Sequence, residues 1–360
     1  MLTILHASDF HLDSPFAALT EEQAVLRRKE QRALLDELRK AASGCDLVLL
    51  PGDLLDSGVC HGETAEALES FLNALPGEVF VSPGNHDYYA AESPYARMKL
   101  RENVHIFTSP QPEAVELPAL GCTVWGAAFT SRRSRGLLRG FSAPQDGRLH
   151  LMLLHGDVNA ASGDYSPIAE AEIAASGLRY LALGHVHACS GLQKSGGTYW
   201  AYPGCLMGRG FDEQGQKGCL RIELDGDRCK ADFVPLSGRQ YAELRVDVTE
   251  ASDLPEAIRA VLPEDAERHI FRILLRGEWA EKPNTAALEA ALQPLCFQAE
   301  VRDETRLRRD VWDEISDDSL RGCFLRVLRE KYDASPEAEK PKIILAARYG
   351  LAALDYREEL

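Results

Sequence analysis

The sequence predicts a mixed α/β fold, in which two sheets form a sandwich with helices outside, followed by a smaller α+β capping domain and a helical tail. Three observations predict it. Strand and helix patterns alternate early in the chain, and successive strand patterns follow one another later. The composition then shifts near residues 235–240. Early alternation favours parallel strands, and the later run of strands favours a second sheet.

Apolar patterns define the elements of the first part in order. The run 2–7 is typical of a strand, and 21–42 of a helix, because Leu34, Leu35 and Leu38 recur at helical spacing. The apolar run at 46–50 is typical of a strand buried on both faces. We then expect a helix at 63–75 and strands at 78–82, 122–127, 149–154, 179–183, 197–202, 217–224 and 228–234.

The last third of the chain has its own pattern. We expect, in order, a strand at 241–247, a helix at 252–262, a strand at 269–275, a helix at 284–293, a strand at 295–302, and closing helices at 305–332 and 336–356. The predicted domains are therefore 1–237, 238–303 and 304–360. The closing helices carry two apolar faces, made of Leu320, Phe324, Val327 and Leu328, and of Ile344, Ala347, Leu351 and Leu354. These two faces either pack onto the capping domain or dock a partner protein.

Composition excludes several classes of protein. The 360 residues are 45% hydrophobic and 27% charged, with a formal net charge of −16, so binding of nucleic acid by bulk positive charge is excluded. No apolar run approaches the ~20 residues that span a bilayer. The first residues lack the pattern of a secretion signal, which predicts a cytoplasmic protein. Nine cysteines without a C-x-x-C pair argue against a disulfide framework and a thiolate zinc site.

One local stretch departs from the acidic average. Residues 117–145 contain no Asp or Glu but include Arg132, Arg133, Arg135 and Arg139. The cluster is either a solvated loop or a loop that contacts phosphate beside an active site.

Polar clusters follow five of the predicted strands. Ligands of open α/β sheets gather at the carboxyl ends of strands, so these clusters should meet at one edge. In chain order they contain Asp9 and His11; Asp53 and Asp56; Asn85, His86 and Asp87; His155 and Asp157; and His185 and His187.

The residue types in these clusters fit a pair of divalent cations. Two cations held ~3.5–4 Å apart need a bridging ligand, and a carboxylate supplies two oxygens and a negative charge. Imidazoles and an amide oxygen complete the shells without excess charge. Such ligands fit Mn, Fe or Zn, with Mg also open, and do not select among them. Gly52, Gly84, Gly156 and Gly184 would allow tight turns and close approach to an anion.

These motifs together resemble the calcineurin-like metallophosphoesterase superfamily. Within it, HASDFHLDSPF, PGDLLDSG, SPGNHD and YPGCLMGRGFDE resemble the SbcD/Mre-type DNA-repair nucleases, and the HLDSPF form is closest to the YhaO-like bacterial branch. The resemblance covers about residues 1–235 and implies the metallophosphoesterase fold for them. Two departures are Asp13-Ser14, where the best-known members have Gly, and Cys205, where Ser is usual.

The resemblance also implies roles for the residues that match its motifs. One metal would take Asp9, His11, Asp53 and His187, and the other Asp53, Asn85, His155 and His185. His86 would face the phosphate as a proton donor or charge stabiliser. Asp56 would orient an imidazole. Asp87 would cap or brace its loop.

The implied activity is metal-dependent hydrolysis of phosphodiesters, most simply by a DNA exonuclease or endonuclease that prefers manganese. Members of this type work with a coiled-coil ATPase of the SbcC type, which docks on the C-terminal part of the nuclease; a homodimer is open as well. The alternative is a metallophosphatase or cyclic-nucleotide phosphodiesterase. Such an enzyme would have little use for the long C-terminal extension.

Overall fold

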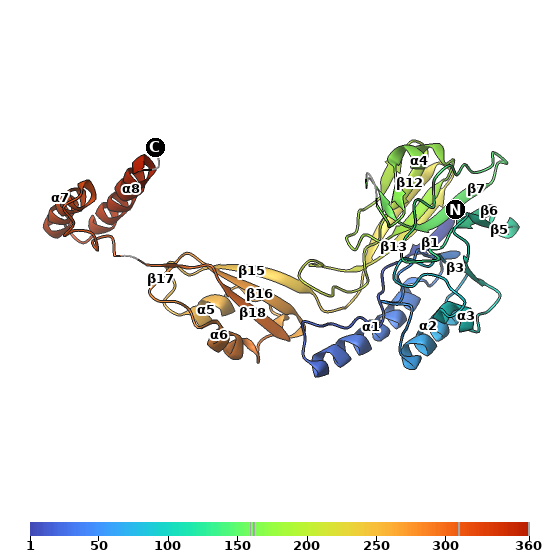
Figure 1. The fold of residues 1–360 in the computed structure, drawn as a ribbon, viewed down its shortest axis with the longest axis horizontal. Helices are drawn as coiled ribbons and strands as arrows, with labels where there is room; N and C mark the ends of the chain where they lie inside the picture. The colour runs from blue at the N-terminus through green and yellow to red at the C-terminus, as the bar shows by residue number, and fades with distance from the viewer. Residues whose placement is uncertain (159, 161–162, 309, 359–360) are drawn as a thin grey trace. The chain divides into compact units, whose positions relative to one another are not determined.

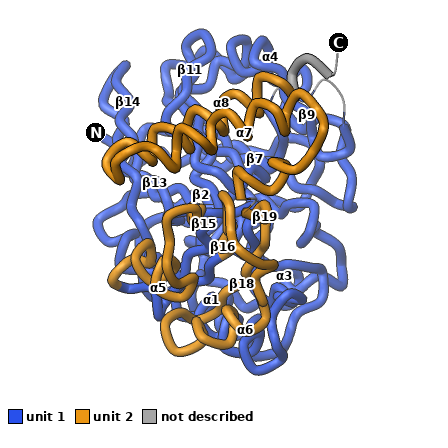
Figure 2. Tube along the Cα trace, turned by 90° about the vertical axis from the view of Figure 1, so that its left-hand side faces the viewer, with its two compact units in different colours: residues 1–243, 265–271 blue, residues 244–264, 272–360 orange. Residues whose placement is uncertain are grey.

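The computed structural model describes residues 1–158, 160, 163–308 and 310–358 (Figure 1). The chain forms two compact units (Figure 2), residues 1–243 with 265–271 and residues 244–264 with 272–360. The predicted separation of residues 304–360 from the capping domain stays a prediction.

The first sheet of unit 1 has six strands in the order β14-β13-β1-β2-β3-β4. Neighbours among the first four strands of the chain are parallel, and β13 and β14 join β1 in antiparallel fashion. The strands are β1 (Leu2–His6), β2 (Leu47–Leu50), β3 (Glu78–Val81), β4 (Val104–Ile106), β13 (Gly218–Asp225) and β14 (Arg228–Pro235).

The second sheet also has six strands, in the order β11-β12-β10-β7-β6-β5. Its four central strands are parallel, and its two edge strands are antiparallel to their neighbours. The strands are β5 (Glu113–Leu117), β6 (Cys122–Gly126), β7 (Leu149–His155), β10 (Tyr180–Gly184), β11 (Gln193–Ser195) and β12 (Thr198–Ala201). A small separate sheet pairs β8 (Asp157–Val158) with β9 (Pro167–Ile168).

Alternate residues of the first sheet fill two different cores, because side chains of a strand point to opposite faces in turn. Leu47 and Leu49 pack with residues of the second sheet, including Leu151. Val48 and Leu50 pack with the helices on the other side. The predicted sandwich with helices outside and the predicted two-sided burial of 46–50 are therefore confirmed.

The helices of unit 1 are α1 (Glu21–Ala41), α2 (Gly62–Ala74), α3 (Pro94–Arg97) and α4 (Glu170–Ala175). The first of these begins at a capping box, in which Thr20 and Gln23 satisfy each other's backbone N–H groups. Its buried residues include Leu34 and Leu38, which pack in the core on the outer face of the first sheet. The spacing of leucines therefore predicts this helix within one residue at its C-terminus.

The capping part of the chain forms a three-stranded sheet with two short helices. The strands are β15 (Tyr241–Asp247), β16 (Ile270–Arg276) and β18 (Gln298–Asp303), and the helices are α5 (Leu254–Arg259) and α6 (Thr285–Leu292). A further pair joins β17 (Glu278–Trp279) to β19 (Arg306–Leu307).

The prediction of one helix over 305–332 is wrong in its first half. The helices of the tail are α7 (Leu320–Ala334) and α8 (Lys340–Glu358). Before these helices, the side chain of Asp310 accepts a hydrogen bond from the backbone N–H of Trp312, and the side chain of Asp317 accepts one from the backbone N–H of Ser319. Such local bonds favour turns over helix, and the apolar spacing alone did not reveal them.

The two tail helices pack against each other around Leu325 and Ala347, joined by Trp312. One predicted apolar face is divided by this packing: Phe324 and Leu328 join the small core, but Leu320 stays exposed. Among the described residues, no helix is long and apolar enough to cross a membrane.

One histidine is built into the core of the sandwich. The His6 ring is fully buried, with Nδ1 2.8 Å from the hydroxyl of Tyr180 and Nε2 3.1 Å from the carbonyl oxygen of Leu183. Burial disfavours the charged ring and lowers the pKa of His6 to about 3, although the carbonyl partly opposes this. The unfolded chain therefore binds a proton between about pH 6.5 and 3 that the folded chain does not.

We predict that acid costs stability through His6. Because the unfolded state binds more protons below pH 6.5, this residue alone should remove about 1.4 kcal/mol of unfolding free energy between pH 7.5 and 5.5. In His6→Gln, which has no such proton, the loss over this range should be smaller by that amount. Urea titrations of both proteins at the two pH values measure the difference; equal losses would contradict the prediction.

Candidate metal centre

Five parallel strands end at this site, and they come from both sheets. The seven predicted ligands follow those ends: Asp9 and His11 after β1, Asp53 after β2, Asn85 after β3, His155 at the end of β7, and His185 and His187 after β10. Six of the seven side chains lie close together, and only His185 stands apart from the others. Parallel strands deliver them because all their carboxyl ends lie on one edge.

The carboxylate of Asp53 lies at the middle of these side chains. Its Oδ2 is 3.3 Å from Nε2 of His155 and 3.8 Å from Nε2 of His11. The side chain is 2% exposed. Three overlapping groups have donor atoms within 4.8 Å of one another: Asp9, His11 and His187; Asp9, Asp53 and His155; and His11, Asp53 and His86.

The imidazoles of His11 and His187 face each other in an arrangement that can bind a cation. Nε2 of His11 lies 3.1 Å from Nε2 of His187. The other nitrogen of each ring faces a carboxylate: Nδ1 of His187 is 2.6 Å from Glu213, and Nδ1 of His11 is 3.2 Å from Asp56, although without hydrogen-bond alignment. Carboxylates only accept, so the hydrogens belong on Nδ1 and both Nε2 atoms present lone pairs. The donor set therefore fits a metal ion.

His155 completes the deepest part of the site. Its Nδ1 lies 3.0 Å from the carbonyl oxygen of Pro51, and its Nε2 lies 2.9 Å from Oδ1 of Asn85. Burial opposes a charge on this ring, but attraction to Asp53 outweighs burial and raises the pKa of His155 to about 9. A metal bound at Nε2 would have to displace that proton.

His185 is placed differently from the other predicted ligands. Its backbone N–H donates to both carboxylate oxygens of Asp9 at 3.1 Å. Its ring lies 5.1 Å from that of His155 and 5.3 Å from that of Tyr165, measured between centroids. His185 belongs to none of the three groups of converging donors found in the described part of the chain.

The backbone at the site is held in unusual conformations. Asp9, His11, Asp53 and His185 have φ of 55°, 44°, 52° and 107°, in the left-handed region that residues with side chains rarely adopt. Strained residues of this kind persist only where the surroundings fix them, and they gather at functional sites.

Glycines admit the close packing of these loops. A Cβ on Gly84 would lie 2.2 Å from Oδ1 of Asp53, and a Cβ on Gly184 would lie 2.0 Å from the carbonyl oxygen of Pro51. Both distances are impossible contacts. The sequence predicts tight turns and close approach to an anion at these glycines; the close approach seen here is to the protein's own ligands and backbone, and approach to an anion stays a prediction.

His86 lies at the exposed side of the centre. Its backbone N–H donates to Oδ1 of Asp53 at 2.9 Å, and its Nδ1 lies 2.8 Å from the carbonyl oxygen of Asp56. The ring meets that of His11 edge-on, with centroids 4.8 Å apart. Because the carbonyl takes the hydrogen on Nδ1, Nε2 is the atom left to reach a substrate.

Two residues that the sequence analysis did not single out support the ligands. Arg209 reaches Asp56 at 3.0 Å and Glu213 at 2.8 Å, so one guanidinium joins the carboxylates that face His11 and His187. Burial would raise the pKa of Glu213, but hydrogen bonds from His187 and Arg209 lower it below its ordinary range. Both residues lie in the segment YPGCLMGRGFDE, whose resemblance to known nucleases did not by itself assign them a role.

Asp87 braces the loop that carries Asn85, as expected. Its buried carboxylate accepts the backbone N–H of Gly84 and of Leu54, both at 2.7 Å. The hydroxyl of Tyr95 donates to it as well, at 2.5 Å.

The predicted arginine loop does not form one surface. Arg132 lines a cavity beside α2, and Arg135 lines a separate hollow near α4. Arg133 pairs with Asp164 at 3.2 Å, with both side chains exposed.

Comparison with known proteins is consistent with this site. Residues 2–189 match the model of the family described as calcineurin-like phosphoesterase. The chain is 28% identical over 342 residues to the uncharacterized metallophosphoesterase YhaO of Bacillus subtilis (strain 168), covering 88% of this chain and 81% of that protein. It is 24% identical over 278 residues to the DNA double-strand break repair protein Mre11 of Aeropyrum pernix, covering 72% of this chain and 66% of that protein.

Proposed function

The chain belongs to the calcineurin-like phosphoesterase family, and from this premise we propose that it is a dinuclear metal-dependent phosphodiesterase that cleaves DNA. The observation that carries the proposal is the convergence of nitrogen and oxygen donors around the buried carboxylate of Asp53. Nε2 of His11 and Nε2 of His187 lie 3.1 Å apart, close enough for both to bind one cation.

In this proposal two cations share Asp53. One would be held by Asp9, His11 and His187, and the other by Asn85, His155 and His185, for which the His185 side chain would have to rotate. Such cations would supply the Lewis acidity that activates water and offsets phosphoryl charge. Manganese is proposed as the favoured ion, with Fe, Zn or Mg as alternatives, because the ligands are imidazoles and oxygens without thiolate.

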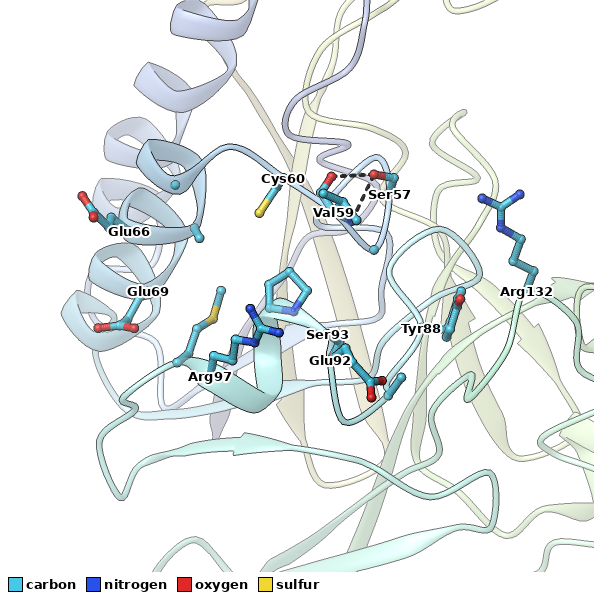
Figure 3. Close-up of a pocket in the computed structure, with 16 residues that line it drawn as sticks. Ser57, Val59, Cys60, Glu66, Glu69, Tyr88, Glu92, Ser93, Arg97 and Arg132 are labelled. Carbon is cyan, nitrogen blue, oxygen red and sulfur yellow. Dashed lines mark hydrogen bonds between the residues drawn. The ribbon is translucent and has the colours of Figure 1, made fainter.

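DNA is the proposed substrate for two reasons. The relative from Aeropyrum pernix is named a DNA double-strand break repair protein. Arg132 lines the cavity beside α2 (Figure 3), has no hydrogen-bond or ion-pair partner among the described residues, and can meet a backbone phosphate. Arg133 and Arg135 are less suited, since Arg133 is paired with Asp164 and Arg135 lines a separate hollow. No ligand reads a base, so cleavage independent of sequence is expected.

His86 is the proposed proton donor to the leaving oxygen. Its backbone is tied to Asp53 and its Nδ1 to the carbonyl of Asp56, so the ring is held at the mouth of the centre. In the same proposal Asp56 keeps the His11 ring oriented.

We predict that hydrolysis of DNA requires the metal centre. Excess EDTA should abolish cleavage of duplex or single-stranded DNA, and Mn²⁺ should restore it. Asp53→Ala should lose the ability to bind two metal ions, because this carboxylate serves both, while Asp157→Ala serves as the control beside the site. Cleavage of small phosphoesters without cleavage of any DNA would instead favour a phosphatase or cyclic-nucleotide phosphodiesterase.

We predict that His86→Ala retains its metal ions but cleaves DNA ~10²–10⁴-fold more slowly, the range of general acid catalysis. The loss should shrink on an ester with a p-nitrophenolate leaving group, which needs no proton. Elemental analysis and parallel kinetics on both substrates measure this. Loss of a metal ion would show that His86 is a ligand, as its place beside His11 and Asp53 allows.

We also propose that a coiled-coil ATPase of the SbcC type docks on the tail helices. The support is a set of exposed apolar residues on α7 and α8: Leu320, Val327, Leu345 and Tyr349, exposed by 71%, 57%, 53% and 70%. Exposed apolar patches mark interaction surfaces.

We predict that Leu320→Asp with Val327→Asp abolishes copurification with such an ATPase and leaves hydrolysis of a small phosphodiester intact. Val25→Asp, at an exposed valine of α1, is the matched control. Full association of the double variant would contradict the docking proposal.

A further inference from the structure

One guanidinium links the two imidazoles that face each other at the metal centre. Nδ1 of His187 lies 2.6 Å from Oε1 of Glu213, and the same oxygen accepts a hydrogen bond from Nη2 of Arg209 at 2.8 Å. On the other side, Nη1 of Arg209 donates to Oδ1 of Asp56 at 3.0 Å, and that oxygen lies 3.2 Å from Nδ1 of His11. These contacts form a closed ring, because Nε2 of His11 lies 3.1 Å from Nε2 of His187.

The guanidinium holds Glu213 in one orientation. Nη2 and Nε of Arg209 face its two carboxylate oxygens, at 2.8 and 3.4 Å, and the backbone N–H of Arg209 donates to Oε2 at 2.8 Å. Nη2 also lies 3.2 Å from Nδ1 of His187, but Oε1 is nearer to both nitrogens and takes both hydrogens. A guanidinium is planar and its N–H groups point in fixed directions, so the two carboxylates that it holds have a fixed spacing. The orientation of both imidazoles therefore depends on one side chain.

Helix α1 holds the backbone on both sides of this ring. The fully buried guanidinium of Arg27 donates from Nη2 to the carbonyl oxygen of Gly208, the residue before Arg209, at 2.9 Å. One turn further along the helix, Nε2 of Gln31 donates to the carbonyl oxygen of His11 at 2.9 Å. The two backbone segments that carry Arg209 and His11 are thus fixed to the same helix.

The guanidinium of Arg209 can also be reached from solvent. It lines a hollow of about 370 Å³ together with Phe16, Asp56 and His86. The Arg209 side chain is 23% exposed. A small cation in solution can therefore enter the space that a shorter side chain at this position would leave.

We propose that Arg209 is a positioning residue, which holds His11 and His187 so that both Nε2 atoms bind one divalent cation. It acts through Asp56 and Glu213 and is not itself a ligand. The inference rests on the proposed function, because it assumes a cation at these two imidazoles. The alternative role for Arg209 is to neutralise the two carboxylates without orienting the rings.

The two roles predict opposite effects when the guanidinium is removed. A positive charge beside a cation site repels the cation, so its loss alone should strengthen binding of the metal. Loss of the planar fork leaves both imidazoles free to rotate, which should weaken binding by about 10–100-fold, the usual effect of losing a partner of a metal ligand. A weaker metal affinity without Arg209 therefore identifies positioning.

The test titrates the metal-free protein with Mn²⁺ and measures free Mn²⁺ by electron paramagnetic resonance. In Arg209→Gln, one of the two ions should bind about 10–100-fold more weakly, and the affinity for the other should change by less than about twofold. Arg209→Lys should show the same loss, because an ammonium keeps the charge but cannot hold two carboxylates at a fixed spacing. Arg148→Gln, which removes an arginine paired with Glu116, is the matched control and should bind both ions as the parent does.

Two results of this titration would overturn the proposal. One is equal or tighter binding of both ions by Arg209→Gln. The other is parental affinity for both ions in Arg209→Lys, which would show that charge alone is needed.

Chemical rescue separates positioning from a general loss of folding. In Arg209→Ala, guanidinium chloride should restore part of the lost affinity for Mn²⁺, whereas KCl at the same ionic strength should not, and the parent should respond to neither. A small cation cannot repair a misfolded protein. Absence of any recovery would therefore overturn the proposal.

The titration also distinguishes this inference from the proposed function. If the parent binds two Mn²⁺ ions and the Arg209 variants weaken one of them, but the parent cleaves no DNA, then DNA cleavage fails as the function and the positioning role stands. If the parent cleaves DNA but the Arg209 variants bind Mn²⁺ as it does, the positioning role fails alone. A parent that binds no Mn²⁺ would overturn both.

Discussion

The buried negative charge of Asp53 is the constraint on which the rest of the site depends. An unpaired carboxylate in a protein interior costs several kcal/mol, so it needs compensation from its surroundings. Burial would raise the pKa of Asp53, yet His155 and His11 lower it below the ordinary range. In the absence of metal, the proton on His155 is the compensating charge. Metal ions would take over that role, which makes proton release and metal binding two sides of one equilibrium.

Bringing ligands from two sheets to one carboxylate requires close approach of backbones. Gly84 and Gly184 leave the space that any Cβ would fill, and Asp9 and Asp53 adopt left-handed φ values. These conformations cost free energy, of order 1–3 kcal/mol each. Side chains of β2 pack alternately into the two cores on either face of the first sheet. This packing supplies the stability that holds the strained loops in place.

The sequence alone could predict the fold of unit 1 and the place of the site, because both are written in local patterns. Apolar runs predict β1 and β2, and the polar residues that follow these strands include Asp9 and Asp53. Long-range partners were less visible: Glu213 acts through His187 over a separation that no spacing rule covers. Apolar spacing also gave a wrong prediction of helix before α7. There the side chain of Asp310 bonds the backbone and favours a turn over a helix.

The turn at Asp13-Ser14 connects the metal centre to the loop that follows Asp56. The hydroxyl of Ser14 donates to the carbonyl of His11 at 2.8 Å and lies 3.1 Å from Oδ1 of Asp56, so it supports the ligand loop. Its neighbour Asp13 anchors that loop through His61. A change at Asp13 would therefore alter the anchoring of the loop that follows Asp56, while every predicted metal ligand stays in place.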